Sequence, residues 1–253
     1  AGTIPFGEVN LIYYNNTTSA ASNYINGTLA STNSSFSTIY SNTNVINIGR
    51  NLDYTDTTSL ANSYRGHIAE ILVFNTVLTD DQRDSIGEYL AIKWGVSNFS
   101  LDRDGDGIQD WVDDNESDYN YIPSSFDSEV GTTSLDSSLK MWLDASRFHG
   151  LDSSGNAYSV SAGNYLSWMD LSGNNNHASQ ETSTNQAYYN VADRQLVSFD
   201  GSSDYYTISK DMNGSTSFRV FMAVEVNSDV SSTQSFLMKG DSSGGNFPYL
   251  INS

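Results

Sequence analysis

Cysteine is absent from this chain of 253 residues, so neither a disulfide nor a thiolate metal site can stabilise it. Without disulfides, an extracellular protein has to be held together by its core or by metal ions. Basic residues are also scarce: 11 Lys and Arg stand against 30 Asp and Glu, giving a formal net charge of −19. Such a chain repels phosphate backbones, which argues against nucleic acid as a partner, and it attracts divalent cations.

Long hydrophobic runs are missing as well. No stretch reaches 18 apolar residues, so we expect no insertion into a membrane. No signal peptide is recognisable, and we interpret the chain as a mature product or as a segment of a longer protein. Hydrophobic residues nevertheless make up 38%, which is enough for a core. They occur in short runs separated by Ser, Thr, Asn, Gly and Asp, a rhythm typical of many short strands joined by turns.

Two segments carry the clearest strand signals. Residues 24–29 contain Asn-Gly between β-formers, which predicts a hairpin with a type I′ turn. Residues 67–75 are apolar on both faces except at Glu70, which predicts a central strand. Further strands are expected at residues 9–14, 45–49, 139–144, 165–170, 196–199, 205–208, 218–226 and 235–239.

One helix is expected, over residues 80–94. Thr79, two aspartates and Gln82 form a capping box that places acidic side chains at the positive end of the helix dipole. Apolar residues then recur at helical spacing as far as Trp94. Gly95 follows, where a helix C-cap belongs.

Several longer motifs resemble the bacterial laminin G-like, concanavalin A-like domains. Residues 64–75 (YRGHIAEILVFN), 78–83 and 89–95 (YLAIKWG) resemble the closing segment of that family, a G-x-I-A-E strand followed by a short helix. The opening segment of the family is matched by residues 139–146 (LKMWLDAS), 168–178 (WMDLSGNNNHA) and 199–205 (FDGSSDY). The resemblance implies an all-β, antiparallel jelly-roll sandwich with one short helix.

The order of these halves is inverted, because the closing half precedes the opening half. We divide the chain into a closing half at residues 1–97, an Asp-rich linker at residues 98–136 and an opening half at residues 137–253. Neither half can bury a sheet face alone, since a sandwich needs both sheets. The halves either meet within one chain, as in a circular permutant, or residues 1–97 complete the opening half of a neighbouring copy in a tandem array. We favour the array.

The linker contains a candidate calcium loop with the pattern D-x-D-x-D-G-x-x-D-x-x-D. Calcium prefers six to eight hard oxygen ligands on a tightly turned loop, and alternate carboxylates can all face inward. The predicted ligands are Asp102, Asp104, Asp106, the Ile108 carbonyl, Asp110 and Asp113. The pattern resembles an EF-hand loop and, more closely, thrombospondin type 3-like repeats of bacterial surface proteins. The alternative is a solvated acidic linker. Bound calcium is expected to stiffen this segment as a joint between domains.

Other residues are weaker candidates. Asn174, Asn176, His177 and Tyr205 could contact a ligand, although the first three are also suited to fixing a turn through backbone hydrogen bonds. Glycoside hydrolysis needs two carboxylates that flank the bond. The strand signature E-x-D-x-x-E is absent, and Glu70 and Glu225 each stand alone on their strands. We therefore expect no enzyme.

Two functions follow as hypotheses. The first is a non-catalytic, secreted or surface-exposed adhesive repeat of a calcium-stiffened fibre, with neighbouring copies of itself as partners. The second is a carbohydrate-binding module that recognises surface glycans.

Overall fold

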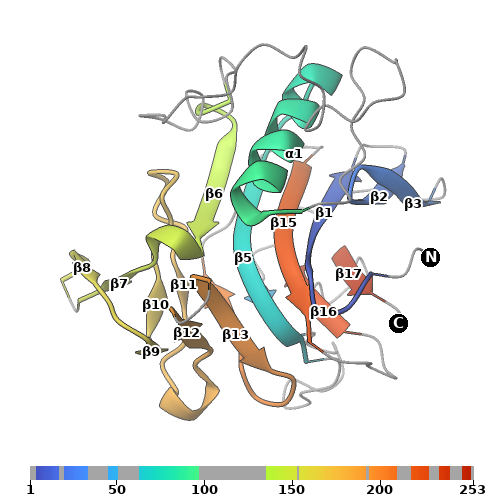
Figure 1. Ribbon diagram of the computed structural model, residues 1–253. Coiled ribbons are helices and arrows are strands. Elements are labelled where there is room, and N and C mark those ends of the chain that lie inside the picture. The colour runs from blue at the N-terminus through green and yellow to red at the C-terminus, as the bar shows by residue number, and fades with distance from the viewer. Residues whose placement is uncertain are drawn as a thin grey trace.

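The structure is a computed structural model that describes residues 4–16, 20–33, 45–50, 63–96, 135–152, 154–191, 194–209, 218–227, 234–239 and 247–251. Within these ranges, the strands form a nine-stranded sheet, a six-stranded sheet and a two-stranded sheet, accompanied by one α-helix (Figure 1). The strand pairs are antiparallel, and a single isolated parallel bridge joins Phe6 to Val226. The expected all-β, antiparallel class is therefore confirmed.

The larger sheet contains the central strand of the fold. Its strands are β1 (Val9–Asn16), β2 (Ala21–Ile25), β3 (Thr28–Asn33), β5 (Arg65–Phe74), β6 (Leu139–Asp144), β9 (Gly163–Asn164), β12 (Tyr188–Asn190), β13 (Leu196–Asp200) and β15 (Phe218–Val226). They are ordered β3-β2-β1-β15-β5-β13-β12-β9, and β6 pairs with the second part of β5.

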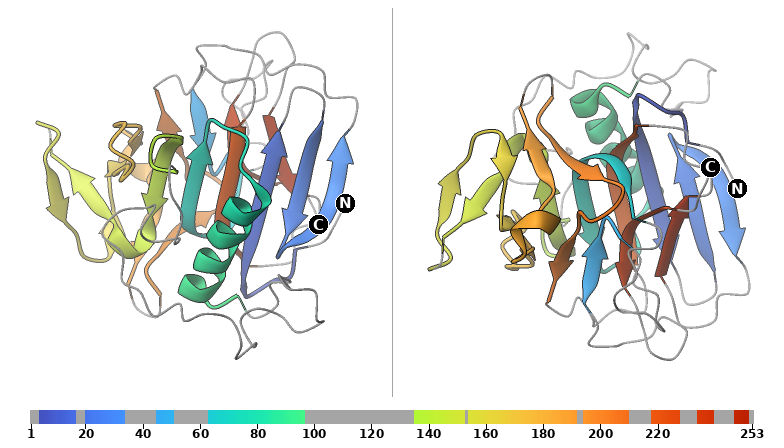
Figure 2. Two further views of the ribbon diagram at one scale, coloured as in Figure 1. Left: turned by 90° about the horizontal axis from the view of Figure 1, so that it is seen from above. Right: turned by 90° about the horizontal axis from the view of Figure 1, so that it is seen from below.

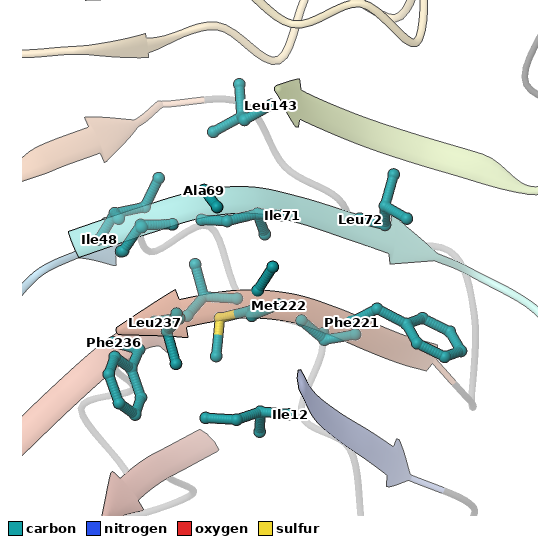
Figure 3. Packing of buried hydrophobic residues seen from close by; sticks show 14 of the residues in the cluster. Ile12, Ile48, Ala69, Ile71, Leu72, Leu143, Phe221, Met222, Phe236 and Leu237 are labelled. Atoms are coloured by element: carbon teal, nitrogen blue, oxygen red, sulfur yellow. The ribbon is translucent and has the colours of Figure 1, made fainter. Parts of the chain in front are cut away.

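The smaller sheet packs against one face of the larger one. It is formed, in spatial order, by β10 (Ser167–Trp168), β11 (Ala178–Ser179), β14 (Tyr206–Ile208), β4 (Ile46–Ile48), β16 (Gln234–Lys239) and β17 (Phe247–Ile251). Ile71 and Met222 of the larger sheet share one core cluster with Ile48 and Phe236 of the smaller sheet (Figure 3). The two sheets therefore form a sandwich around this core. The separate pair is β7 (His149–Leu151) with β8 (Ala157–Ser159).

The helix α1 (Asp80–Trp94) lies on the opposite face of the larger sheet (Figure 2). Thr79 accepts a hydrogen bond from the backbone of Gln82, whose side chain accepts one from the Thr79 backbone, so the predicted capping box is confirmed. Gly95 ends the helix with a left-handed φ of 68°. Ile86 and Leu90 are buried against the sheet. Burial of each such side chain contributes about 1.5–3 kcal/mol to stability.

The two halves of the sequence close one sandwich within a single chain. β15, from the second half, is hydrogen-bonded between β1 and β5 of the first half. Val224 pairs with Ile68, and Val220 pairs with Val73. Strands from both halves of this one chain alternate in the same sheet, which favours closure within one chain over our preferred expectation that residues 1–97 complete a neighbouring copy.

Most local predictions agree with the structure, with one clear exception. Asn26 and Gly27 have φ values of 48° and 78°, the two positive angles of the predicted type I′ turn. The strand expected at residues 165–170 is reduced to Ser167–Trp168. It ends early because the carboxylate of Asp170 accepts backbone hydrogen bonds from the following turn.

Candidate functional sites

The predicted calcium ligands, Asp102 to Asp113, lie outside the described residues. The residues on either side of this segment are described by the structure and are buried in the core. Val96, after the helix, is buried, and Leu135, before β6, is fully buried in the same core cluster. The Asn75 backbone also donates a 3.0 Å hydrogen bond to the Ser138 carbonyl. The residues on both sides of the segment therefore belong to one sandwich, which favours a loop of one module over our expectation of a joint between one sandwich and the next.

A buried polar cluster lies where the helix meets the larger sheet. Glu70 of β5 is fully buried, and its carboxylate accepts hydrogen bonds from three aromatic side chains. The donors are the indole Nε1 atoms of Trp94 and Trp142, each at 2.8 Å, and the hydroxyl of Tyr89 at 3.0 Å. The ammonium of Lys93 lies 2.9 Å away. Glu70 therefore joins α1 to both β5 and β6.

A second carboxylate shares the same lysine. Asp144, at the end of β6, lies 2.6 Å from Lys93 Nζ and is also fully buried. Its other contacts are hydrogen bonds from Ser146 and a 3.6 Å ion pair with Arg147. Burial, followed by the nearby Asp144 charge, raises the pKa of Glu70 to about 7. Both carboxylates are occupied in holding helix to sheet.

Asp170 organises the turn that contains three of the predicted ligand residues. Its carboxylate accepts hydrogen bonds from the backbone N–H groups of Trp142 at 2.8 Å, Ser172 at 3.0 Å and Asn176 at 2.8 Å. Asp170 is only 2% exposed, so these three groups have a charged acceptor in place of water.

The structure brings Asn174, Asn176 and His177 together at this turn. The side-chain amide of Asn174 donates to the Leu139 carbonyl, and that of Asn176 donates to the Lys140 carbonyl. His177 Nδ1 accepts a 3.0 Å hydrogen bond from the Asp170 backbone. These contacts favour the alternative considered from the sequence, in which the three residues fix the turn. A ligand role for them stays a prediction.

Tyr205, the fourth predicted ligand residue, lies elsewhere, in the connection between β13 and β14. The Arg50 guanidinium carbon lies 3.2 Å from the centroid of the Tyr205 ring. Arg50 Nε also donates to the side chain of Asn47 in β4. One face of the Tyr205 ring is therefore covered by a cation, and only the other face remains for stacking against a sugar.

A row of polar side chains crosses the larger sheet on the helix-bearing side. We call these five residues the polar row: Asn164, Tyr188, Ser198, His67 and Glu225. Each is the direct antiparallel partner of the next, on β9, β12, β13, β5 and β15 respectively. Directly paired residues point to the same face of a sheet. The row is therefore a contiguous set of polar groups contributed by both halves of the chain.

The positions of Ala223 and Glu225 on β15 show which face of the larger sheet carries the polar row. Ala223 pairs with Glu70, whose side chain contacts the helix, and Glu225 lies two residues further along the same strand. Residues two apart on a strand share a face. Figure 1 shows α1 over one end of β5 and β15, whereas the end of β5 that pairs with β13 is not under the helix.

Sequence reasoning missed both the buried cluster and the polar row. A signal for the cluster was present, because a carboxylate inside an apolar strand has to be paired. The motifs that resemble the family contain three residues that could have been proposed as partners of Glu70, namely Lys93, Trp94 and Asp144. The polar row had no comparable signal, since its five strands are far apart in the sequence and their register is not visible there.

No family model, no curated protein and no solved structure matches this chain. In the part of the chain that the structure describes, no three His, Asp or Glu side chains gather closely enough to hold a metal ion. Over the same residues, no helix is both long and apolar enough to cross a membrane.

Proposed function

We propose that this chain is a non-catalytic, extracellular binding module with a concanavalin A-like jelly-roll sandwich. The observation that carries this proposal is the position of Glu70. It is the one carboxylate on the central strand, and it is fully buried with four donors around it. A general acid or nucleophile has to reach its substrate. A sandwich whose most conspicuous carboxylates are occupied internally is better suited to binding than to hydrolysis.

The sequence motifs support the choice of this sandwich class. The G-x-I-A-E segment forms the central strand β5, and the segment ending in K-W-G forms the helix that covers it. The W-x-D-x-S-G-N segment forms the turn around Asp170. The first two motifs join the two halves of the chain, through the pairing of β5 with β6 and the ion pair of Lys93 with Asp144, whereas the third fixes a turn within the second half.

Calcium binding by the Asp-rich segment is part of the proposal. Since this segment leaves and rejoins the same sandwich, calcium would order a loop of one module and would not stiffen a joint between two modules. Without calcium, the five aspartates repel one another. Extracellular modules commonly bind calcium with dissociation constants of about 10⁻⁴–10⁻³ M, a range that matches calcium outside cells.

Isothermal titration with calcium tests this part of the proposal. We expect binding by the wild type, and binding at least about tenfold weaker by the D113A variant, since a carboxylate ligand is lost. Asp80→Asn, an exposed acid on the helix, is the matched control and should bind like the wild type. Unchanged affinity in D113A would refute the calcium site.

Two further measurements test the remaining claims. Incubation with neutral polysaccharides should release no reducing ends; release that disappears in a Glu70→Gln or Glu225→Gln variant would show an enzyme. Light scattering should show a monomer with and without calcium. Filaments that dissociate in chelator would instead favour the calcium-stiffened surface fibre.

A further inference from the structure

Lys93 and Asp144 are in direct contact, although one lies near the end of α1 and the other at the end of β6 (Figure 1). Lys93 Nζ lies 2.6 Å from Asp144 Oδ2, so the nitrogen touches an atom bonded directly to the carboxyl carbon. The Asp144 side chain is fully buried, and that of Lys93 is 17% exposed. Reacting groups held in a suitable orientation reach effective molarities of about 10⁵–10⁸ M, which favours a reaction between this amine and this carboxyl group.

Glu70 places a proton carrier beside the same pair. It is the direct antiparallel partner of Asp144, so both carboxylates point to the same face of the larger sheet. Glu70 Oε2 lies 2.9 Å from Lys93 Nζ. Burial, followed by the Asp144 charge, raises the pKa of Glu70 to about 7. This carboxylate can therefore take up and return a proton near neutral pH.

Aromatic side chains orient Glu70 and limit the access of water. The indoles of Trp94 and Trp142 and the hydroxyl of Tyr89 donate hydrogen bonds to its carboxylate. Both indoles belong to buried residues of the core. Two opposite charges are costly to desolvate in such a place, so a reaction that converts the ion pair into neutral groups is favoured. Exclusion of water also disfavours hydrolysis of the product.

The two oxygens of Asp144 have different partners. Oδ1 accepts hydrogen bonds from the Ser146 backbone at 2.9 Å and from the Ser146 hydroxyl at 2.7 Å. Oδ2 contacts Lys93, and Arg147 Nε lies 3.6 Å from it. Donors at Oδ1 stabilise the negative charge that forms there when a nucleophile adds to the carboxyl carbon. Oδ2 is then the oxygen that leaves.

We propose that Lys93 and Asp144 form an intramolecular isopeptide bond and that Glu70 is the catalytic residue of this reaction. A proton first passes from Nζ to Oδ2, which gives a neutral amine and a neutral carboxylic acid. The nitrogen lone pair then adds to the carboxyl carbon, and an electron pair of the C=O bond moves to Oδ1. Glu70 takes a proton from the nitrogen and delivers it to the Oδ2 hydroxyl, which leaves as water while the carbonyl re-forms at Oδ1.

The reaction is balanced without an oxidant, a reductant or a further reactant. One C–N bond forms and one C–O bond breaks, so that an ammonium and a carboxylate become an amide and one water. Glu70 returns to its starting form. The reaction occurs once in each chain, so the module stays non-catalytic toward other molecules. The bond does not depend on what the module binds.

The bond closes a covalent ring over residues 93–144, which contains the whole Asp-rich segment. Such a cross-link stabilises a fold mainly by restricting the unfolded chain. In a chain without cysteine, it supplies a cross-link that does not depend on redox conditions. It also keeps α1 joined to β6 when the chain is cut within the Asp-rich segment.

Mass spectrometry of the full chain tests the proposal. After incubation at pH 7, the wild type should be lighter than its sequence mass by one water. A succinimide at an aspartate also loses one water, so the site is assigned by digestion with trypsin. Trypsin cannot cut after an acylated Lys93, so residues 84–103 should appear joined to residues 141–147. The ion-paired form is instead cut at Lys93 and yields no joined peptide.

Three variants separate the bond from the ion pair. Lys93→Arg keeps the cation but has no primary amine, and Asp144→Ala has no carboxyl group, so both should stay at their full sequence mass. Glu70→Gln keeps the shape of the side chain but cannot carry the proton, and it should slow cross-linking at least about a hundredfold. Lys140→Arg, on β6, is the matched control and should cross-link like the wild type. Circular dichroism confirms that each variant is folded.

The outcomes decide between a bond and an ion pair. Wild type that stays at its sequence mass, with Lys93 cut by trypsin, overturns the proposal. A loss of water that digestion places at another aspartate also overturns it. Cross-linking at the wild-type rate in folded Glu70→Gln overturns catalysis by Glu70. None of these results affects the calcium or binding measurements. Comparisons of unfolding at Lys93 refer to the ion-paired form, which the intact mass distinguishes from the cross-linked form.

Discussion

Val220 of β15 is the direct antiparallel partner of Val73 of β5, so a residue of the second half of the sequence lies in register with one of the first half. Both side chains are buried, with 2% and 5% exposure. The pairing places the centre of the larger sheet at the junction of the two halves. Whether the sandwich closes within one chain can therefore be tested at this single pair.

A double cysteine variant, V73C/V220C, should form an intramolecular disulfide. The chain has no cysteine of its own, so the background is clean. Directly opposed strand residues have Cβ atoms near the separation that a disulfide needs. We expect a monomer with faster migration on non-reducing gels, reversed by reductant. The single variants V73C and V220C are the controls. Disulfide-linked dimers and higher ladders from the double variant would show instead that neighbouring copies complete each other.

Lys93 should be essential to stability because it compensates two buried carboxylates. Lys93→Met leaves Glu70 and Asp144 without their shared cation, and breaking such a buried pair costs about 3–5 kcal/mol. We expect this loss in the free energy of unfolding by urea at pH 8. Lys140→Met, on the neighbouring strand β6, is the matched control and should change stability by less than about 1 kcal/mol. A comparable loss in both variants would refute the role of the cluster.

The loss in free energy of unfolding caused by Lys93→Met should change with pH in a direction that the pKa of Glu70 predicts. Burial and Asp144 raise the pKa of Glu70 from 4.5 to about 7, so between these values the folded state binds more protons than the unfolded state. The Glu70 contribution to the free energy of unfolding therefore falls as the pH rises through this window. Removing the Lys93 charge raises the pKa of Glu70 further. The loss in Lys93→Met should thus be smaller at pH 5 than at pH 8, and an equal loss at both would contradict the assignment.

Asp170 should contribute more to the free energy of unfolding than an exposed aspartate in a similar turn does. Asp170→Ala leaves three backbone N–H groups, two in the turn and one on β6, without their acceptor, and we expect a loss of about 3 kcal/mol in the free energy of unfolding. Asp152 accepts comparable backbone bonds from Ser154 and Asn156, but in water. Water replaces the carboxylate in Asp152→Ala, so its change should be much smaller. Equal effects would show that burial is not the deciding factor.

The local part of the fold could be predicted from the sequence. The helix begins and ends where the capping box at Thr79 and the glycine at position 95 place it, because these signals act over a few residues. The Asn26-Gly27 turn has the expected positive φ values for the same reason. The strand at residues 218–226 was also predicted with its observed bounds, since it is long and apolar.

The long-range part could not be predicted in the same way. The choice between closure within one chain and between chains depends on loop geometry and register, and no residue of β5 or β15 encodes either alone. The strand expected at residues 165–170 failed because Asp170 uses its carboxylate for the turn, a side-chain contact that outweighs strand propensity. The polar row required the register of five strands at once, and only the structure supplies it.

The protonation of His67 should be directly measurable, because the chain has only three histidines. Burial lowers the pKa of His67 below 6.5, while Glu225 on β15 opposes this shift. The unfolded state then binds the proton more readily, so the contribution of His67 to stability is complete above 6.5 and is lost as the pH falls toward the lowered pKa. The side-chain nitrogen of Asn227 lies 2.9 Å from His67 Nε2 and can only donate, so a neutral ring carries its proton at Nδ1, 2.7 Å from the Ser198 hydroxyl. Long-range ¹H–¹⁵N spectra at pH 7 should show a neutral ring protonated at Nδ1, the form that donates to Ser198. A ring protonated at Nε2, or one that titrates above 6.5, would show that Ser198 does not receive its hydrogen bond from His67. His67→Asn should remove the assigned resonance.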